Sequence, residues 1–161
     1  HWDAMIAAAE LAKKSNTLVS FDGGANRFRE EIREFMPLVD IAIVAKDWAN
    51  RFSGSTNTEI AAQAIRQTGP KLVAITDGLA GSWIFPETGD AFHQPAFPDE
   101  NCIDTTGCGD VYHGAFLAGL AKSWDLRECA KIASAMAALN TRGLGGRGNL
   151  RSLDEIRDEF S

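Results

Sequence analysis

The chain has 161 residues, of which 45% are hydrophobic and 24% are charged, a composition typical of a folded globular domain rather than a disordered or fibrous protein. Its 16 basic and 22 acidic residues leave a net charge of -6, and no basic cluster interrupts this excess, so nucleic acid is not an expected partner. No apolar run reaches the roughly 18 residues that a membrane span requires, and no signal peptide is recognised, so no membrane partner is expected.

The N-terminal part of the chain predicts two helices around a strand and a loop. The sequence begins at His1 without Met, directly in a helical pattern, which indicates a truncated or processed chain. Apolar residues at a period of about 3.6 predict helices over residues 2–14 and 27–36, the second stopped by Pro37. Residues 17–21 predict a short strand, and the glycine-rich stretch 22–26 predicts a loop.

Two nearly continuous apolar runs, residues 40–45 and 71–76, predict parallel strands that are covered on both faces. Between them, the capping box formed by Thr56 and Glu59 predicts the start of a helix that Gly69 and Pro70 end. Segments 81–85 and 91–94 then predict a hairpin.

Helices dominate the remaining chain. Residues 108–121 and 126–142 have helical patterns, and a capping box at Ser152 and Glu155 predicts a last short helix. Strands that alternate with helices predict a layered parallel sheet. We therefore predict a single α/β domain over residues 1–161.

The motif D-T-T-G-C-G-D, residues 104–110, lies directly before one of these predicted helices. Two glycines at a helix start allow backbone amides to converge on one point, and the helix dipole adds to the positive field there. Such a turn predicts an anion site. An ionised Asp110 beside it suits phosphoryl transfer, in which a carboxylate accepts the proton of the attacking hydroxyl. The alternative is that Asp110 only caps the helix.

This motif, followed by G-A-F, resembles the C-terminal signature of the ribokinase-like (PfkB) carbohydrate kinases. The resemblance covers the whole chain but only the C-terminal half of the family's length, so it implies a ribokinase-like fold that lacks the N-terminal half and the β-lid. It implies that Asp110 is the catalytic base and that Gly107, Cys108 and Gly109 form the anion hole. It also implies that Asp104 orders the loop or holds a monovalent cation. Cys108 replaces the family's usual Ala, which we expect to be neutral.

A second stretch, T-D-G-L-A-G after the strand 71–76, is similar to the family's nucleotide-phosphate loop. The resemblance implies cofactor contacts from Thr76, Gly78 and Gly81, and a base pocket or cation site lined by Ser134, Asn140 and Gly145. It implies ATP and Mg²⁺ as cofactors, K⁺ as a candidate cation, and a small-molecule sugar as the substrate.

The family's N-x-x-E motif, which helps to organise magnesium, is not found at its expected place. That place reads Ala45-Lys46-Asp47-Trp48-Ala49, which resembles the S-K-D-x-A of ketohexokinases and points to a ketose-type substrate, with Asp47 acting indirectly through water. Asp22, Asn26 and Arg27 are similar to a D-x-N-x-R pattern of sugar-acid kinases, although the spacing is imperfect and the residues also suit an ordinary turn.

Several alternative interpretations exist. Residues 143–148 fit G-x-G-x-x-G, but they follow a helix rather than a strand, and the P-loop sequence is absent, which disfavours dinucleotide-binding and P-loop proteins. His113 has no second His or Cys at metal spacing and is more typical of a packed helix residue.

The main competing hypothesis is a catalytically incomplete fragment that binds nucleotide, or an assembly protein that retains the kinase fold, because the missing half would position the sugar. The absent lid would expose a sheet edge and apolar surface, which predicts a homodimer. Three cysteines without a C-x-x-C pair predict reduced thiols in a cytoplasmic protein: Cys102, Cys108 and Cys129.

Overall fold

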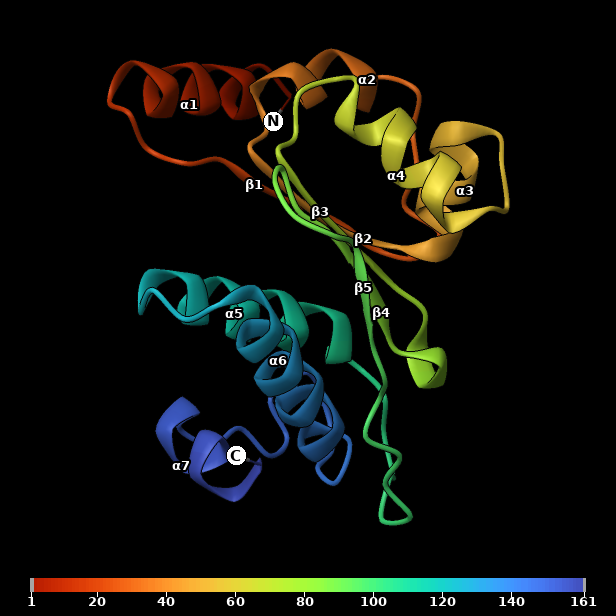
Figure 1. The fold of residues 1–161 in the computed structure, drawn as a ribbon, viewed down its shortest axis with the longest axis vertical. Coiled ribbons are helices and arrows are strands. Elements are labelled where there is room, and N and C mark those ends of the chain that lie inside the picture. The colour runs from red at the N-terminus through yellow and green to blue at the C-terminus, as the bar shows by residue number, and fades with distance from the viewer. Residues whose placement is uncertain (1, 161) are drawn as a thin grey trace. The chain divides into compact units, whose positions relative to one another are not determined.

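The computed structural model describes residues 2–160, which form two compact units (Figure 1). Unit 1 contains the chain up to Thr76 together with Trp83–Phe92, and unit 2 contains Asp77–Ser82 and the chain from His93 onwards. The single domain over residues 1–161 stays a prediction. Within residues 2–160, no helix is both long enough and apolar enough to cross a membrane.

The strands form one five-stranded sheet in the order β1-β2-β3-β4-β5. The pairs β1–β2 and β2–β3 are parallel, with Ser20 opposite Ile41 and Ile41 opposite Leu72. Only residues 77–81 link β3 to β4, which is too short for the crossover that parallel neighbours need. The predicted layered α/β fold with a mostly parallel sheet is confirmed. The strands are β1 (Ser20–Gly23), β2 (Ile41–Ala45), β3 (Leu72–Thr76), β4 (Ser82–Phe85) and β5 (Phe92–Gln94).

In unit 1 the helices lie on one side of β1–β3 (Figure 1). Every second residue of β2 and β3 points into the core beneath them, because side chains alternate between the two faces of a strand. These residues, Ala42, Val44, Val73 and Ile75, pack with helix residues such as Trp48. The helices are α1 (Trp2–Lys14), α2 (Ile32–Phe35), the 3₁₀ turn η1 (Met36–Leu38), α3 (Lys46–Ser53) and α4 (Thr58–Arg66).

The helix predicted over residues 27–36 is shorter in the structure. Only α2 and η1 are helical, because Asn26 has a left-handed φ of 58° and Phe28 turns inward, with its ring 5.7 Å from that of Trp48. Helix α3, which presents Trp48 and Phe52 to the core, was not predicted. Strand β1 extends to Gly23, where a Cβ atom would lie 2.5 Å from Val44 Cγ1, so a glycine of the predicted loop serves packing instead.

The capping predictions differ in outcome. Helix α4 begins one residue later than predicted, because the side chain of Asn57, not that of Thr56, accepts the Ile60 amide at 3.0 Å. The capping box before the last helix is confirmed: Ser152 Oγ accepts the Glu155 amide, and Glu155 Oε2 accepts the Ser152 amide at 3.0 Å.

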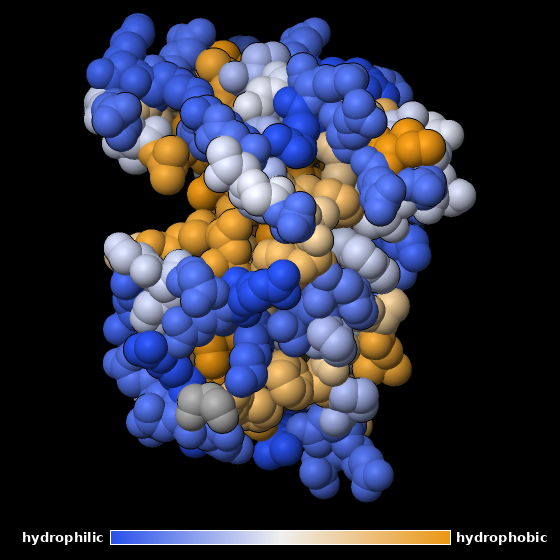
Figure 2. Space-filling view, viewed as in Figure 1, coloured by the Kyte–Doolittle hydropathy of each residue, from blue (hydrophilic) through white to orange (hydrophobic). Residues whose placement is uncertain are grey.

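Unit 2 is built on the packing of α5 against α6. Gly119 permits the close approach, since a Cβ atom there would lie 2.9 Å from Cys129 Sγ, and burial raises the pKa of that thiol to about 11. Hydrophilic side chains cover much of the surface on the side shown in Figure 2. The elements are the 3₁₀ turn η2 (Gly78–Ala80), α5 (Cys108–Ala121), α6 (Leu126–Asn140) and α7 (Leu153–Phe160).

Candidate functional site

The turn at residues 104–110 lies in unit 2, where Gly107 is the N-cap residue of α5. Gly107 has a left-handed φ of 76°, and a Cβ atom on it would lie 2.5 Å from the Gly146 Cα atom. The position therefore needs glycine for two reasons, its backbone conformation and its contact with another backbone segment. The first i→i−4 bond of the helix runs from the Val111 amide to the Gly107 carbonyl at 2.8 Å.

The amides before Val111 belong to the helix start, where no intrahelical acceptor exists. The Cys108 amide bonds weakly to the Thr105 carbonyl at 3.3 Å, and among residues 2–160 the Gly109 amide has no acceptor. Asp110 is exposed in the same first turn. An anion and the Asp110 side chain can therefore both be accommodated at this helix end.

Cys108 contributes a small side chain to the turn. Its Sγ atom donates to the Ala137 carbonyl at 3.5 Å, and burial raises the pKa of the thiol. The thiol is thus kept neutral and turned toward α6, and the expectation that its replacement of the family's usual Ala is neutral stays a prediction.

Asp104 joins two loops of the turn region. Its Oδ1 atom accepts the Thr106 amide at 2.8 Å, and its Oδ2 atom accepts the Gly145 amide at 2.7 Å. The hydrogen bond from the Thr106 side chain, followed by the two amides, lowers the pKa of Asp104 below its ordinary value. Ordering of the loop, one of the two roles expected for this residue, agrees with these contacts.

Asn140 is fully buried at the end of α6 and connects the same loops. Its Nδ2 atom donates to the carbonyls of Thr106 at 3.4 Å and Gly146 at 3.5 Å, and its Oδ1 atom accepts the Asn149 amide. Through these contacts, Asn140 holds the 104–110 turn and the loop after α6 together. A contact of Asn140 with a nucleotide base stays a prediction.

The loop over residues 77–81 is closed by its own backbone. The Asp77 amide donates to the Gly81 carbonyl at 2.9 Å, and His93 Nε2 lies 2.7 Å from the Ala80 carbonyl oxygen. Gly78 and Gly81 have φ values of 51° and 88°, and a Cβ atom at Gly81 would lie 2.2 Å from the Gln94 carbonyl oxygen. Both glycines are thus required by the conformation.

The structure brings together in unit 2 the residues of the turn with Asp104, Asn140 and Gly145. Ser134 is buried midway along α6. Thr76 ends β3 in unit 1, where its Oγ1 atom donates to the Val44 carbonyl at 3.5 Å.

Sequence reasoning missed three residues of unit 2. Gly146 was recognised only as part of a glycine-rich loop. The buried hydroxyls of Ser82 and Tyr112 gave no local signal, because their hydrogen bond joins residues 30 positions apart in the sequence.

The structure also shows structural roles for residues of the 143–148 loop and for Asp47. Gly143 and Gly148 close the loop on itself, since a Cβ atom on either would come within 2.3 Å of the other's backbone. In unit 1, Asp47 Oδ2 accepts the Asn26 amide at 2.8 Å and thereby fixes the loop after β1. Among residues 2–160, no three His, Cys, Asp or Glu side chains form a metal-binding group.

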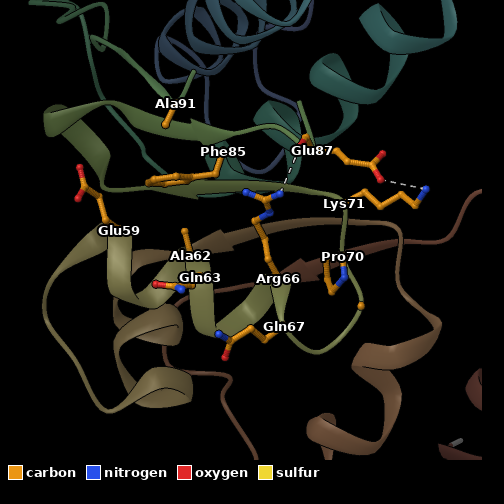
Figure 3. A pocket seen from close by; sticks show the side chains of 11 residues that line it. Glu59, Ala62, Gln63, Arg66, Gln67, Pro70, Lys71, Phe85, Glu87 and Ala91 are labelled. Carbon is orange, nitrogen blue, oxygen red and sulfur yellow. Dashed lines mark hydrogen bonds and ion pairs between the residues drawn. The ribbon is translucent and has the colours of Figure 1, made fainter. Parts of the chain in front are cut away.

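A groove of about 760 Å³ in unit 1 contains none of the predicted site residues (Figure 3). It runs along α4, where Arg66 donates to the Glu87 carbonyl at 3.4 Å and Lys71 pairs with the Glu87 carboxylate at 3.2 Å. Lys71 directly precedes β3, so the groove lies at the amino end of that strand. Ligands of parallel sheets bind at the carboxyl end instead.

Asp104→Asn is expected to lower the melting temperature at pH 7, because an amide group would face the two backbone donors. A lowered pKa stabilises the folded state above the ordinary value of 3.8, and that contribution disappears as the pH falls through the folded-state pKa. The melting temperatures of parent and variant should therefore draw closer as the pH falls below 3.8. Calorimetric scans between pH 7 and pH 3 measure this.

Glu100→Gln, which neutralises an exposed carboxylate on the preceding loop, is the matched control for the loss of charge. Equal melting temperatures for Asp104→Asn and the parent at pH 7 would contradict the role of Asp104 in ordering the loop.

Comparison with known proteins identifies the family. A model of the pfkB family carbohydrate kinases matches residues 1–152. A nucleoside kinase from Methanothermobacter thermautotrophicus is 27% identical over 94% of this chain and 48% of its own length. An ATP-dependent 6-phosphofructokinase from Thermoanaerobacterium thermosaccharolyticum is 28% identical over 92% of this chain and 48% of its own length.

The adenosine kinase structure from Sinorhizobium meliloti has a TM-score of 0.85 at 26% identity, and the alignment covers 99% of this chain and 50% of that one. The chain spans about half the length of the curated relatives it matches. Since the family match extends over the sheet, α5 and α6 and includes the D-T-T-G-C-G-D turn, the chain belongs to the pfkB family of carbohydrate kinases.

Proposed function

We propose that the chain is the nucleotide-binding and catalytic part of a kinase that transfers the γ-phosphoryl group of ATP to a sugar hydroxyl. One observation carries the proposal: the left-handed Gly107 is the N-cap of α5, which exposes Asp110 in its first turn. The positive end of the helix and a proton acceptor are then only one helical turn apart. Family membership and the name of the ATP-dependent relative support the same reaction.

In the proposed reaction, amides of Gly107, Cys108 and Gly109 stabilise the charge that develops on the transferred phosphoryl group. Asp110 accepts the proton of the attacking hydroxyl as the oxygen–phosphorus bond forms. The loop at residues 77–81 holds the other phosphates, and Thr76, Ser134, Asn140 and Gly145 contribute on the nucleotide side.

The residues present fit the phosphates of a nucleotide. A Cβ atom at Gly78, Gly109 or Gly145 would meet nothing within 4 Å, so these backbone segments leave room for a ligand. Mg²⁺ would neutralise phosphate charge, and it usually binds through phosphates, water and one or two carboxylates rather than a protein cage. For K⁺, Asp104 stays the predicted residue.

Family membership indicates the general class of the acceptor but not the individual substrate. Relatives named for nucleosides and for fructose phosphate share a sugar hydroxyl as the acceptor class. The ketose preference inferred from residues 45–49 stays a prediction, and the bond from the Asn26 amide to Asp47 gives this carboxylate a structural role instead. The homodimer and the cytoplasmic location also stay predictions.

Binding of ADP tests the nucleotide site directly. We expect the chain to bind ADP and Mg-ATP, because the 77–81 and 143–148 loops and the 104–110 turn are all present. A ligand at 100 times its Kd stabilises a fold by about 2.7 kcal/mol, so a rise in melting temperature should accompany the calorimetric heat. Absence of both heat and thermal shift with millimolar Mg-ATP would contradict the site.

Phosphate transfer from ATP to a panel of sugars and nucleosides, measured with the full-length protein, then tests the reaction. Nucleotide binding without transfer to any acceptor would favour the alternative function, a nucleotide-binding or assembly protein that retains the kinase fold.

A further inference from the structure

Two buried hydroxyl groups bond to each other in unit 2. Ser82 Oγ and Tyr112 Oη lie 2.8 Å apart, and the two residues are 1% and 5% exposed. Ser82 is the first residue of β4, and Tyr112 lies in the second turn of α5. A hydroxyl pair at this depth excludes water, so each group is the other's partner.

Each hydroxyl belongs to a segment of the candidate site. Ser82 directly follows Gly81, the last residue of the 77–81 loop. Tyr112 lies two residues after Asp110, and residues two apart point to opposite sides of a helix. Accordingly, Asp110 is exposed while Tyr112 is buried. Tyr112 thus anchors the inner side of α5 near its start, and Asp110 lies on the outer side.

We propose that Ser82 and Tyr112 are positioning residues that hold the 77–81 loop in register with the first turn of α5. The inference rests on the proposed function, in which the loop binds ATP phosphates and Asp110 meets the acceptor hydroxyl. Phosphoryl transfer depends mainly on positioning and charge stabilisation, so a fixed link between these two segments orients ATP for the reaction.

The residues around the hydrogen bond between Ser82 and Tyr112 keep it in place. Burial raises the pKa of the Tyr112 phenol above its ordinary range, so the group stays neutral. The ring packs against Phe116 with centroids 6.0 Å apart, which keeps it in place if the hydroxyl is removed. Tyr112→Phe therefore removes the bond with little change in packing.

A double-mutant cycle separates positioning from stability. Tyr112→Phe or Ser82→Ala alone leaves one buried hydroxyl without a partner, which lowers the melting temperature. The double variant removes both hydroxyls, so its melting temperature should return toward that of the parent. The link is still absent, so we expect the KM for ATP to stay raised about threefold to tenfold in all three variants, with the KM for the sugar changed less than about twofold.

These kinetic constants are measured in the full-length protein, together with the Kd of ADP, which requires no turnover. Ser53→Ala removes a hydroxyl that bonds within unit 1 and is the control; its KM for ATP should equal that of the parent. A double variant that recovers both the melting temperature and the parent KM and Kd would overturn the positioning role. Failure of the proposed function appears separately, as a parent protein that transfers no phosphate from ATP.

Discussion

Asp110→Asn is expected to lower kcat of the full-length enzyme at least about a hundredfold, while ADP still binds. Asparagine preserves the size of the side chain but cannot accept the proton of the attacking hydroxyl. Asp110 is exposed, so its replacement disturbs no packing, and the amides of Gly107 and Gly109 that we assign to phosphate remain. Steady-state kinetics gives kcat, and calorimetry with ADP gives the affinity.

A helix-capping role for Asp110 makes a different prediction. Gly107 occupies the N-cap of α5, whereas Asp125 is a genuine N-cap, because its side chain accepts the Glu128 amide at 2.9 Å on α6. Asp125→Asn is therefore the matched control and should leave kcat within about twofold of the parent, since asparagine caps helices as well as aspartate does. Near-parent turnover of Asp110→Asn would refute the assignment of the catalytic base.

The parallel strands and the longest helices could be predicted because their burial follows a local pattern. Strands β2 and β3 are continuous in apolar residues, and α5 begins at paired glycines. Helix α3, Lys46–Ser53, escaped prediction because it directly follows β2 and no side chain caps its start. Its buried residues Trp48, Ala49 and Phe52 follow helical spacing, which was the available signal.

The candidate site could be predicted as far as its residues are contiguous. The 104–110 turn is a local motif, and its left-handed glycine follows from the helix start. The contacts behind it join distant segments: Gly107 with Gly146, Asp104 with Gly145, and Ser82 with Tyr112. Such pairs depend on how α6 and β4 return to the turn, and no local periodicity encodes that.

Gly107→Ala should be a strongly damaging single-methyl change at the start of α5. A left-handed backbone costs a non-glycine residue about 1–2 kcal/mol. The added Cβ atom would also lie 2.5 Å from Gly146 Cα and 2.8 Å from the Gly146 carbonyl oxygen, and backbone atoms cannot move aside as a flexible side chain can. We therefore expect the free energy of unfolding to fall by about 2 kcal/mol or more and ADP affinity to fall with it.

Gly114→Ala is the matched control, because Gly114 lies on the same helix with no atom within 4 Å of the added Cβ atom. This substitution should raise the free energy of unfolding by about 0.5–1 kcal/mol, since alanine favours a helix interior. Urea unfolding monitored by circular dichroism measures both variants, and calorimetry measures ADP binding. If Gly107→Ala unfolded and bound ADP as the parent does, the two backbones could not be in contact, and the anion site would lose the geometry that aims its amides at one phosphate.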